Sequence, residues 1–190
     1  MNSFYFVRHG ETDYNKLNLV QGQQDFHLNQ KGRDEAKYIA NKIKNLNFDL
    51  IYCSTLLRAK ETASIIKKEA GFNIDIQYDK RLIERNFGEA EGKKVSEVFT
   101  YFSNKTTHTI KGYESDSEVY NRVYSFIKEI NSNIDNKNIL VVTHSNSILC
   151  LLMNISEEYK IDYKIKNCSL TKIDVDKYNN LKIDFANKII

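Results

Sequence analysis

The sequence predicts an α/β fold: a three-layer sandwich with a mostly parallel central sheet, helices on both faces, and a short cover segment over the C-terminal ends of the strands. Two observations lead to this class. Short β-prone runs alternate along the chain with segments whose apolar residues recur at helical spacing. Several of these runs are almost wholly apolar, which is typical of parallel strands that are buried on both faces.

The N-terminal part of the chain contains a β–α–β unit. Phe4–Val7 is a short β-prone run, and apolar residues then recur at helical spacing between Ala36 and Leu46. Asp49–Cys53 forms the next predicted strand. A second helix follows from Leu57 and ends near Gly71, which suits a left-handed cap, before the alternating stretch Ile74–Tyr78.

The C-terminal half repeats this alternation. Ser115 and Glu118 have the spacing of a capping box, at the head of a helix whose apolar positions run from Val119 to Ile134. Ile139–Thr143 is predicted to be a continuous buried strand. It leads into an apolar helix over Ile148–Met153.

The chain ends with two β-prone runs, about Ser169–Val175 and Leu181–Phe185, joined by a turn, and these predict an antiparallel hairpin. Between Leu82 and Ile110 the periodicity weakens, and we expect an irregular segment with one short helix. We therefore expect a single domain over residues 1–190, in which residues from about 85 to 112 form the cover segment.

Composition limits the classes of function. The 28 Lys and Arg residues nearly balance the 25 Asp and Glu residues along the chain, which implies no nucleic-acid or lipid surface. Cys53, Cys150 and Cys168 are widely spaced, which disfavours a disulfide framework and a zinc site. The sequence contains no apolar stretch long enough to cross a membrane and no secretory leader, so we expect a cytoplasmic protein.

Two histidines follow predicted buried strands directly. His9 comes after the first strand and His144 after Ile139–Thr143, and parallel sheets bind ligands at the carboxyl ends of their strands. Arg8 precedes His9, and Arg58 follows the strand that ends at Cys53. Guanidinium groups pair with phosphoryl oxygens, while a neutral imidazole can attack phosphorus. Each residue taken alone is more often structural, but together they indicate a phosphoryl site.

Five sequence blocks occur in an order that resembles the histidine phosphatase superfamily, which includes cofactor-dependent phosphoglycerate mutases and many small phosphomonoesterases. They cover nearly the whole chain. The blocks are Val7–Thr12, Tyr52–Ala63, Leu82–Gly92, Gly112–Ser115 and Val141–His144.

The resemblance implies a set of site residues. His9 would become phosphohistidine, which requires a neutral ring whose other nitrogen donates to a fixed acceptor such as a backbone carbonyl. Glu84 would carry the proton for the leaving oxygen. Ser145 stands where the family usually has Gly, and would narrow the pocket or add a hydroxyl donor. The implied catalytic residues are His9, Glu84 and His144, and the implied substrate-binding residues are Arg8, Asn15, Arg58 and Ser145.

Several functions remain open at this point. The resemblance implies hydrolysis of a small phosphorylated metabolite, such as a sugar phosphate, phosphoserine or alpha-ribazole phosphate, with no metal or cofactor. A phosphoglycerate mutase is the first alternative, although the segment from Gly92 to Gly112 is shorter than the mutases' basic insertion. A non-catalytic phosphate-binding relative and a metallohydrolase are the others. Glu84 has a structural alternative, an ion pair with Arg81 or Arg85. The sequence predicts no oligomeric state.

Overall fold

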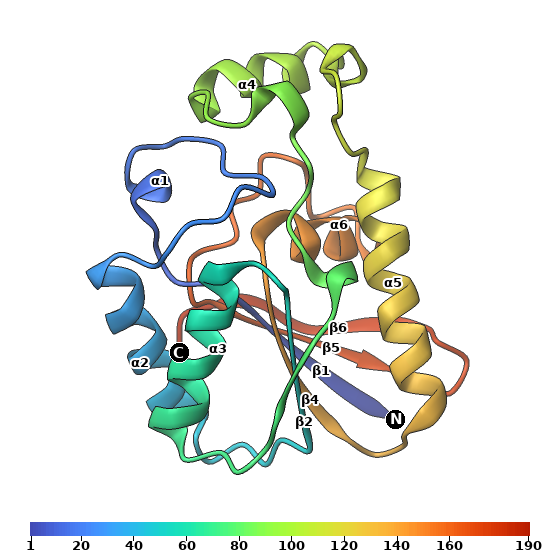
Figure 1. Ribbon diagram of the computed structural model, residues 1–190. Coiled ribbons are helices and arrows are strands. Elements are labelled where there is room, and N and C mark those ends of the chain that lie inside the picture. Colours follow the sequence, from blue (N-terminus) through green and yellow to red (C-terminus); the bar gives the residue numbers. More distant parts are fainter.

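The computed structural model describes residues 1–190 and contains one six-stranded sheet with the strand order β3-β2-β4-β1-β5-β6 (Figure 1). β1, β2, β3 and β4 are mutually parallel, and the hairpin of β5 and β6 is antiparallel. This arrangement confirms the predicted mostly parallel sheet. The strands are β1 (Asn2–Arg8), β2 (Leu50–Cys53), β3 (Ile76–Tyr78), β4 (Asn138–Thr143), β5 (Leu170–Val175) and β6 (Leu181–Lys188).

Six α-helices accompany the sheet, and none of them is long and apolar enough to cross a membrane. Short 3-10 turns occupy Lys80–Leu82, Gly88–Ala90 and Thr107–Thr109. The helices are α1 (Asp13–Lys16), α2 (Gln30–Ile43), α3 (Leu57–Ala70), α4 (Val95–Ser103), α5 (Asp116–Asn133) and α6 (Ser145–Ile155).

The sheet is covered on both faces, by α2 and α3 on one side and by α5 and α6 on the other (Figure 1). Successive side chains of a strand point to opposite faces. Ile139 and Val141 of β4 therefore pack into the core with α5 and α6, whereas Leu140 and Val142 pack into the core with α2 and α3. A central strand of this kind packs apolar side chains on both faces, which is why Ile139–Val142 of β4 are all apolar.

The predicted helix ends agree with the structure at two places and differ at one. α3 ends at Gly71, whose φ of 72° is left-handed, and α5 begins after the capping box of Ser115 and Glu118. α6 begins at Ser145, three residues before the predicted start at Ile148. Its first turn is polar, because this end of the helix faces the candidate site rather than the core.

Three further differences from the prediction arise because the periodicity of apolar residues does not locate strand ends or very short helices. β3 begins at Ile76 rather than Ile74, and β6 continues to Lys188 rather than ending at Phe185. α1 was not predicted, because a helix of only four residues shows no periodic pattern. It is stabilised instead by a capping box.

The register of the central strands aligns their C-terminal ends. Arg8 of β1 pairs with Thr143 of β4, and the amide of His9 continues this ladder by donating to the Thr143 carbonyl at 3.0 Å. On the other side of β4, the amide of Ser54 donates to the Val142 carbonyl at 2.9 Å. The residues that follow β1, β2 and β4 therefore emerge at one edge of the sheet.

The cover segment, residues from about 85 to 112, includes α4 and lies beyond this edge (Figure 1). Phe87 forms a bridge with Tyr113 at its base, and Lys94 forms a bridge with Leu19 in the loop after α1. A small separate cluster of five buried residues supports it. The cluster consists of Val20, Phe87, Ala90, Val98 and Ile110.

A close backbone contact fixes the loop after β1 against the start of α2. A Cβ atom on Gly32 would lie 2.1 Å from the carbonyl oxygen of Glu11, and one on Gly10 would lie 2.3 Å from the carbonyl oxygen of Gly32. Both contacts are with backbone atoms, which cannot move aside as a flexible side chain can. Glycine at both positions allows the chain immediately after His9 to pack on α2.

We predict that Gly32→Ala lowers the free energy of unfolding by about 1–3 kcal/mol, because the added methyl group forces the two backbone segments apart. Urea denaturation measures this change. Lys37→Ala, at an exposed position of the same helix, is the control and should change stability by less than about 0.5 kcal/mol. Equal free energies of unfolding for the two variants would show that the loop after β1 can move away from α2 without loss of stability.

Candidate active site

His9 and His144 lie side by side at the C-terminal ends of β1 and β4. Their ring centroids are 5.2 Å apart, and both side chains are buried. The parallel register of β1 and β4 explains this, because each histidine directly follows one of two paired residues. The sequence prediction that these two residues share one site therefore agrees with the geometry.

The hydrogen bonds of His9 define which ring nitrogen carries the proton. Nδ1 lies 2.7 Å from the carbonyl oxygen of Gly10, so Nδ1 must be the protonated donor. Nε2 accepts from Nε of Arg58 at 3.2 Å and thus carries the lone pair. Burial, followed by the positive charges of Arg58 and Arg8, lowers the pKa of His9 well below its ordinary value. The ring is therefore neutral, with a nucleophilic Nε2.

His144 is held by a different partner. Its Nε2 lies 2.7 Å from the hydroxyl oxygen of Ser54, and its buried Nδ1 has no hydrogen-bond partner. Burial, then the charge of Arg58, lowers the pKa of His144 well below its ordinary value. The site thus contains two neutral imidazoles, and one of them contacts a positively charged guanidinium.

Arg58 is the second residue of α3, and its side chain is completely buried. Besides the bond to His9, Nη1 donates to the Gln24 carbonyl at 2.8 Å and Nη2 to the Gly22 carbonyl at 2.7 Å. Burial lowers the pKa of Arg58 to about 10, which the negative charge of Glu84 opposes. The guanidinium is still charged at neutral pH, and it ties the loop after α1 to His9.

Arg8 provides a second guanidinium, which is partly buried. Nη1 donates to the carbonyl of Ile165 at 2.5 Å, while the buried Nε has no hydrogen-bond partner. Burial lowers the pKa of Arg8, and the charge of Glu84 is again the largest opposing influence. Arg58 is buried and Arg8 partly buried, and the hydrogen bonds of both go to neutral groups. This end of the site is therefore strongly attractive to an anion.

Glu84 follows the 3-10 turn after β3 and is only 6% exposed. Its Oε1 accepts from the backbone amide of Arg85 at 2.8 Å and from that of Asn146, in the first turn of α6, at 3.2 Å. Oε2 makes only a longer contact of 3.4 Å with the same Asn146 amide. Two backbone amides thus hold one carboxyl oxygen, and the other makes a single longer contact.

The ion-pair alternative for Glu84 is wrong in this structure. Arg81 pairs with Asp79 at 2.6 Å, and Arg85 pairs with Asp116 at 2.5 Å. Both guanidinium groups therefore point to other carboxylates, and the contact between Glu84 and Arg85 involves the backbone amide alone.

The predicted residues meet at a cavity of ≈ 380 Å³ between the sheet edge and the cover segment. Asn15 directs its Oδ1 to the capping box of α1, which leaves its amide nitrogen as a donor. Ser145 begins α6. His144 does not line the cavity but lies beside His9. The predicted residues that line it are Arg8, His9, Asn15, Arg58, Glu84 and Ser145.

Comparison with known proteins identifies the family. The model of the histidine phosphatase superfamily (branch 1) matches residues 4–187. The chain belongs to this superfamily. The resemblance inferred from the five sequence blocks is thereby confirmed.

Curated relatives of this histidine phosphatase include both phosphatases and mutases. A protein from Hydrogenobacter thermophilus, named as a candidate phosphoserine phosphatase, is 32% identical over 187 residues, which cover 93% of this chain and 91% of the relative. A 2,3-bisphosphoglycerate-dependent phosphoglycerate mutase from Cytophaga hutchinsonii is 32% identical over 161 residues, covering 80% and 76%. The solved structure of YhfR from Bacillus stearothermophilus is 27% identical, with a TM-score of 0.86 and coverage of 100% and 98%.

Sequence reasoning missed several residues that hold this histidine phosphatase site together. Thr62 accepts from the amide of Gly10 at 3.0 Å, and Asn167 donates to the carbonyl of His9 at 2.8 Å. Ser54 directly follows a predicted strand, and Asn167 precedes a strand that runs antiparallel to β1, so both had a strand-end signal. Thr62 lies within a helix and had none.

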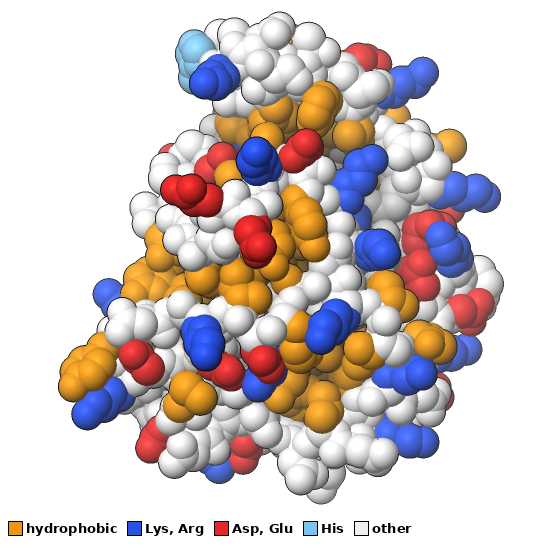
Figure 2. Space-filling view, turned by 180° about the vertical axis from the view of Figure 1, so that it is seen from behind, with side chains coloured by type: hydrophobic (Ala, Val, Ile, Leu, Met, Phe, Trp, Pro, Cys, Tyr) orange, Lys and Arg blue, Asp and Glu red, His pale blue; other side chains and the backbone are white.

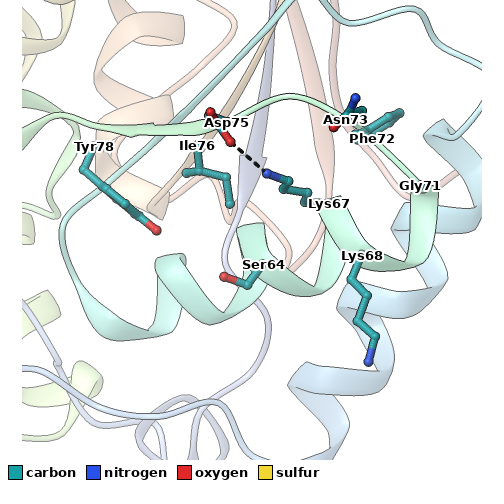
Figure 3. Close-up of a pocket in the computed structure, with 9 residues that line it drawn as sticks. All are labelled: Ser64, Lys67, Lys68, Gly71, Phe72, Asn73, Asp75, Ile76 and Tyr78. Atoms are coloured by element: carbon teal, nitrogen blue, oxygen red, sulfur yellow. Dashed lines mark hydrogen bonds and ion pairs between the residues drawn. The ribbon is translucent and has the colours of Figure 1, made fainter.

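Other parts of the molecule lack this combination of groups. No three His, Cys, Asp or Glu side chains are grouped so as to hold a metal ion, and the three cysteines are buried and unpaired. A second depression of ≈ 720 Å³ lies beside the C-terminal half of α3 (Figure 3). It is crossed by the ion pair of Lys67 and Asp75 and contains no histidine or arginine.

We predict that the two buried histidines make the protein less stable in acid. An unfolded histidine binds a proton near pH 6.5, whereas folded His9 and His144 do not until the pH is much lower. The unfolded state then binds more protons, so stability is full above about pH 6.5 and is lost as the pH falls below it. Each of the two histidines lowers the free energy of unfolding by up to about 1.4 kcal/mol for each pH unit below this value.

Urea denaturation between about pH 5 and 7 tests this linkage. His144→Asn should remove the contribution of one group and so flatten the dependence of stability on pH. The control is His108→Asn, because His108 is exposed and should leave the slope unchanged. A wild-type slope in His144→Asn would contradict the assignment of His144 as a buried neutral ring.

Proposed function

We propose that the chain, as one domain of residues 1–190, hydrolyses a small-molecule phosphomonoester through a phosphohistidine on His9. The observation that carries the proposal is the state of His9. Its Nδ1 donates to a backbone carbonyl, and its unprotonated Nε2 lies beside a buried guanidinium at a cavity. A neutral nucleophile among cations suits attack on a phosphoryl dianion.

In the first step, Nε2 of His9 attacks phosphorus, the N–P bond forms, and the ester P–O bond breaks. Glu84 gives its proton to the departing oxygen and becomes a carboxylate, so that the alcohol leaves neutral. The bond from Nδ1 to the Gly10 carbonyl stabilises the positive charge that develops on the ring. It also holds the ring in one orientation.

Arg8 and Arg58 bind the phosphoryl oxygens in this proposal. Their charges oppose the negative charge that the three oxygens carry in the transition state, and burial makes this interaction stronger than it would be in water. Asn15 and Ser145, which line the cavity, supply further donors around the group, and His144 lies beside the His9 ring. Because the surrounding backbone already holds these side chains, little reorganisation is needed when the substrate binds.

In the second step, water attacks the phosphohistidine. The Glu84 carboxylate takes a proton from the water, the new P–O bond forms, and the N–P bond breaks to return the lone pair to Nε2 of His9. Inorganic phosphate leaves, and Glu84 is protonated again. The sum of the two steps is one ester and one water converted to one alcohol and one phosphate.

A phosphoglycerate mutase would share the first step but must also hold a second acidic group. The basic residues that line the cavity are Arg8, Arg58 and Lys164, and none of them comes from the cover segment. This favours water over a second substrate oxygen as the acceptor. An assay of 3-phosphoglycerate isomerisation beside phosphate release separates the two activities.

We predict that wild-type protein releases phosphate from phosphomonoesters in excess chelator, and that His9→Ala abolishes both this release and the acid-labile phosphoenzyme. The reason is that His9 carries the only imidazole that lines the cavity, and no thiol lines it. Phosphate release and acid-quench trapping of labelled enzyme measure the two effects. The exposed control His108→Ala should keep the wild-type rate. Activity that disappears in chelator and returns with a divalent metal would indicate a metallohydrolase instead.

We predict that Glu84→Gln slows alkyl phosphates far more than nitrophenyl phosphate. An alkoxide needs a proton in order to leave, whereas a nitrophenolate departs with little assistance, so the two losses should differ by at least about tenfold. Steady-state kinetics on both substrates give the comparison. An equal loss on both, together with lower thermal stability, would assign Glu84 a structural role at the start of α6.

A further inference from the structure

The wall of the cavity that faces the phosphate end is apolar. It combines α4 of the cover segment, the loop after α1, and the segment between α6 and β5. The space-filling view shows hydrophobic side chains gathered beneath the cover segment at the top of the molecule (Figure 2). Principal contributors are Leu19, Val95, Phe99, Phe102, Ile161 and Tyr163.

Two of these side chains are unusually exposed. Val95 and Phe99 are each 45% exposed and are four residues apart, so they lie on the same face of α4. Val98, which also lines the cavity, is 1% exposed and belongs to the small core of the cover segment. α4 therefore anchors itself in the protein through Val98 and leaves Val95 and Phe99 partly exposed at the cavity.

Charged groups are scarce on this wall. Apart from the residues assigned to the phosphate end, the charged lining residues are Glu11, Asp162 and Lys164. Lys164 is exposed, so water screens its charge. A second phosphate or a carboxylate on the substrate would thus meet an apolar surface and lose its hydration without gaining a guanidinium partner.

We infer that this wall binds the organic part of the substrate, and that the preferred substrates are phosphate monoesters of apolar alcohols, aliphatic or aromatic, without a second anionic group. The inference rests on the proposed function, because it uses His9 and the two arginines to fix the phosphate. It adds the chemical class of the leaving alcohol, which the phosphate end alone does not determine.

A series of ethyl, butyl and hexyl phosphate tests the inference, since these leaving groups differ in apolar surface and hardly in acidity. We predict that kcat/KM rises about threefold to fourfold for each methylene that the wall covers. Phosphoserine and 3-phosphoglycerate, with comparable alkyl leaving oxygens and added charge, should fall below butyl phosphate. A flat series, or a preference for either charged substrate, would overturn the inference.

Phe99→Ser is the variant that tests the wall itself. It should lower kcat/KM for hexyl phosphate by about fivefold more than for ethyl phosphate, because the longer chain loses more contact. Tyr178→Ser, which removes an aromatic ring that is 72% exposed in the β5–β6 turn, is the matched control and should keep the wild-type ratio. Circular dichroism and thermal unfolding establish that both variants fold. If Phe99→Ser keeps the wild-type ratio of kcat/KM between hexyl and ethyl phosphate, the wall does not bind the alkyl chain and the inference is overturned.

Binding of alkyl phosphonates by calorimetry separates this inference from the proposed function. Phosphonates keep the charged group but cannot be hydrolysed. Their affinity therefore measures the contact between the alkyl chain and the wall without turnover. Affinity that rises from ethyl to hexyl phosphonate supports the inference, and affinity independent of chain length overturns it. Failure to hydrolyse any monoester would instead overturn the proposed function, and the phosphonate series would still decide the inference.

Discussion

In-register parallel pairing of β1 with β4 places Arg8 opposite Thr143, so that His9 and His144 leave the sheet at the same level. Pairing of β2 with β4 brings Ser54 to the same edge, where its hydroxyl contacts His144. Because side chains alternate along a strand, a shift of one residue would turn the buried residues of β4 to the opposite faces. The two hydrophobic cores that hold the register therefore also hold the spacing of the two imidazoles.

The buried guanidinium of Arg58 connects this sheet edge to the rest of the site. Removing a cation from water is costly, and the carbonyl groups of Gly22 and Gln24 offset only part of that cost. The same bonds shape the loop after α1 and give His9 a charged neighbour. One side chain thus links the position of a loop, the neutral state of His9 and the affinity of the site for an anion.

The two ends of the cavity have different structural origins. Its phosphate end is built on strand and helix ends that the main cores support, as His9 and Arg58 illustrate. Its apolar wall comes largely from loops and from α4, which rests on a cluster of only five buried residues. Segments of this kind tolerate change without loss of the main fold, so they are where relatives with one reaction can differ in substrate.

The amino-acid sequence by itself determined the alternation of strands and helices and the placement of His9 and His144 at strand ends, because periodicity is a local property of the chain. Only the tertiary structure decided that Nδ1 of His9 donates to Gly10 and that Glu84 contacts the amide of Asn146 rather than an arginine. It also decided that Asn167 reaches His9. Most of these contacts join residues more than sixty positions apart, and they depend on sheet register and helix packing, which no local pattern specifies.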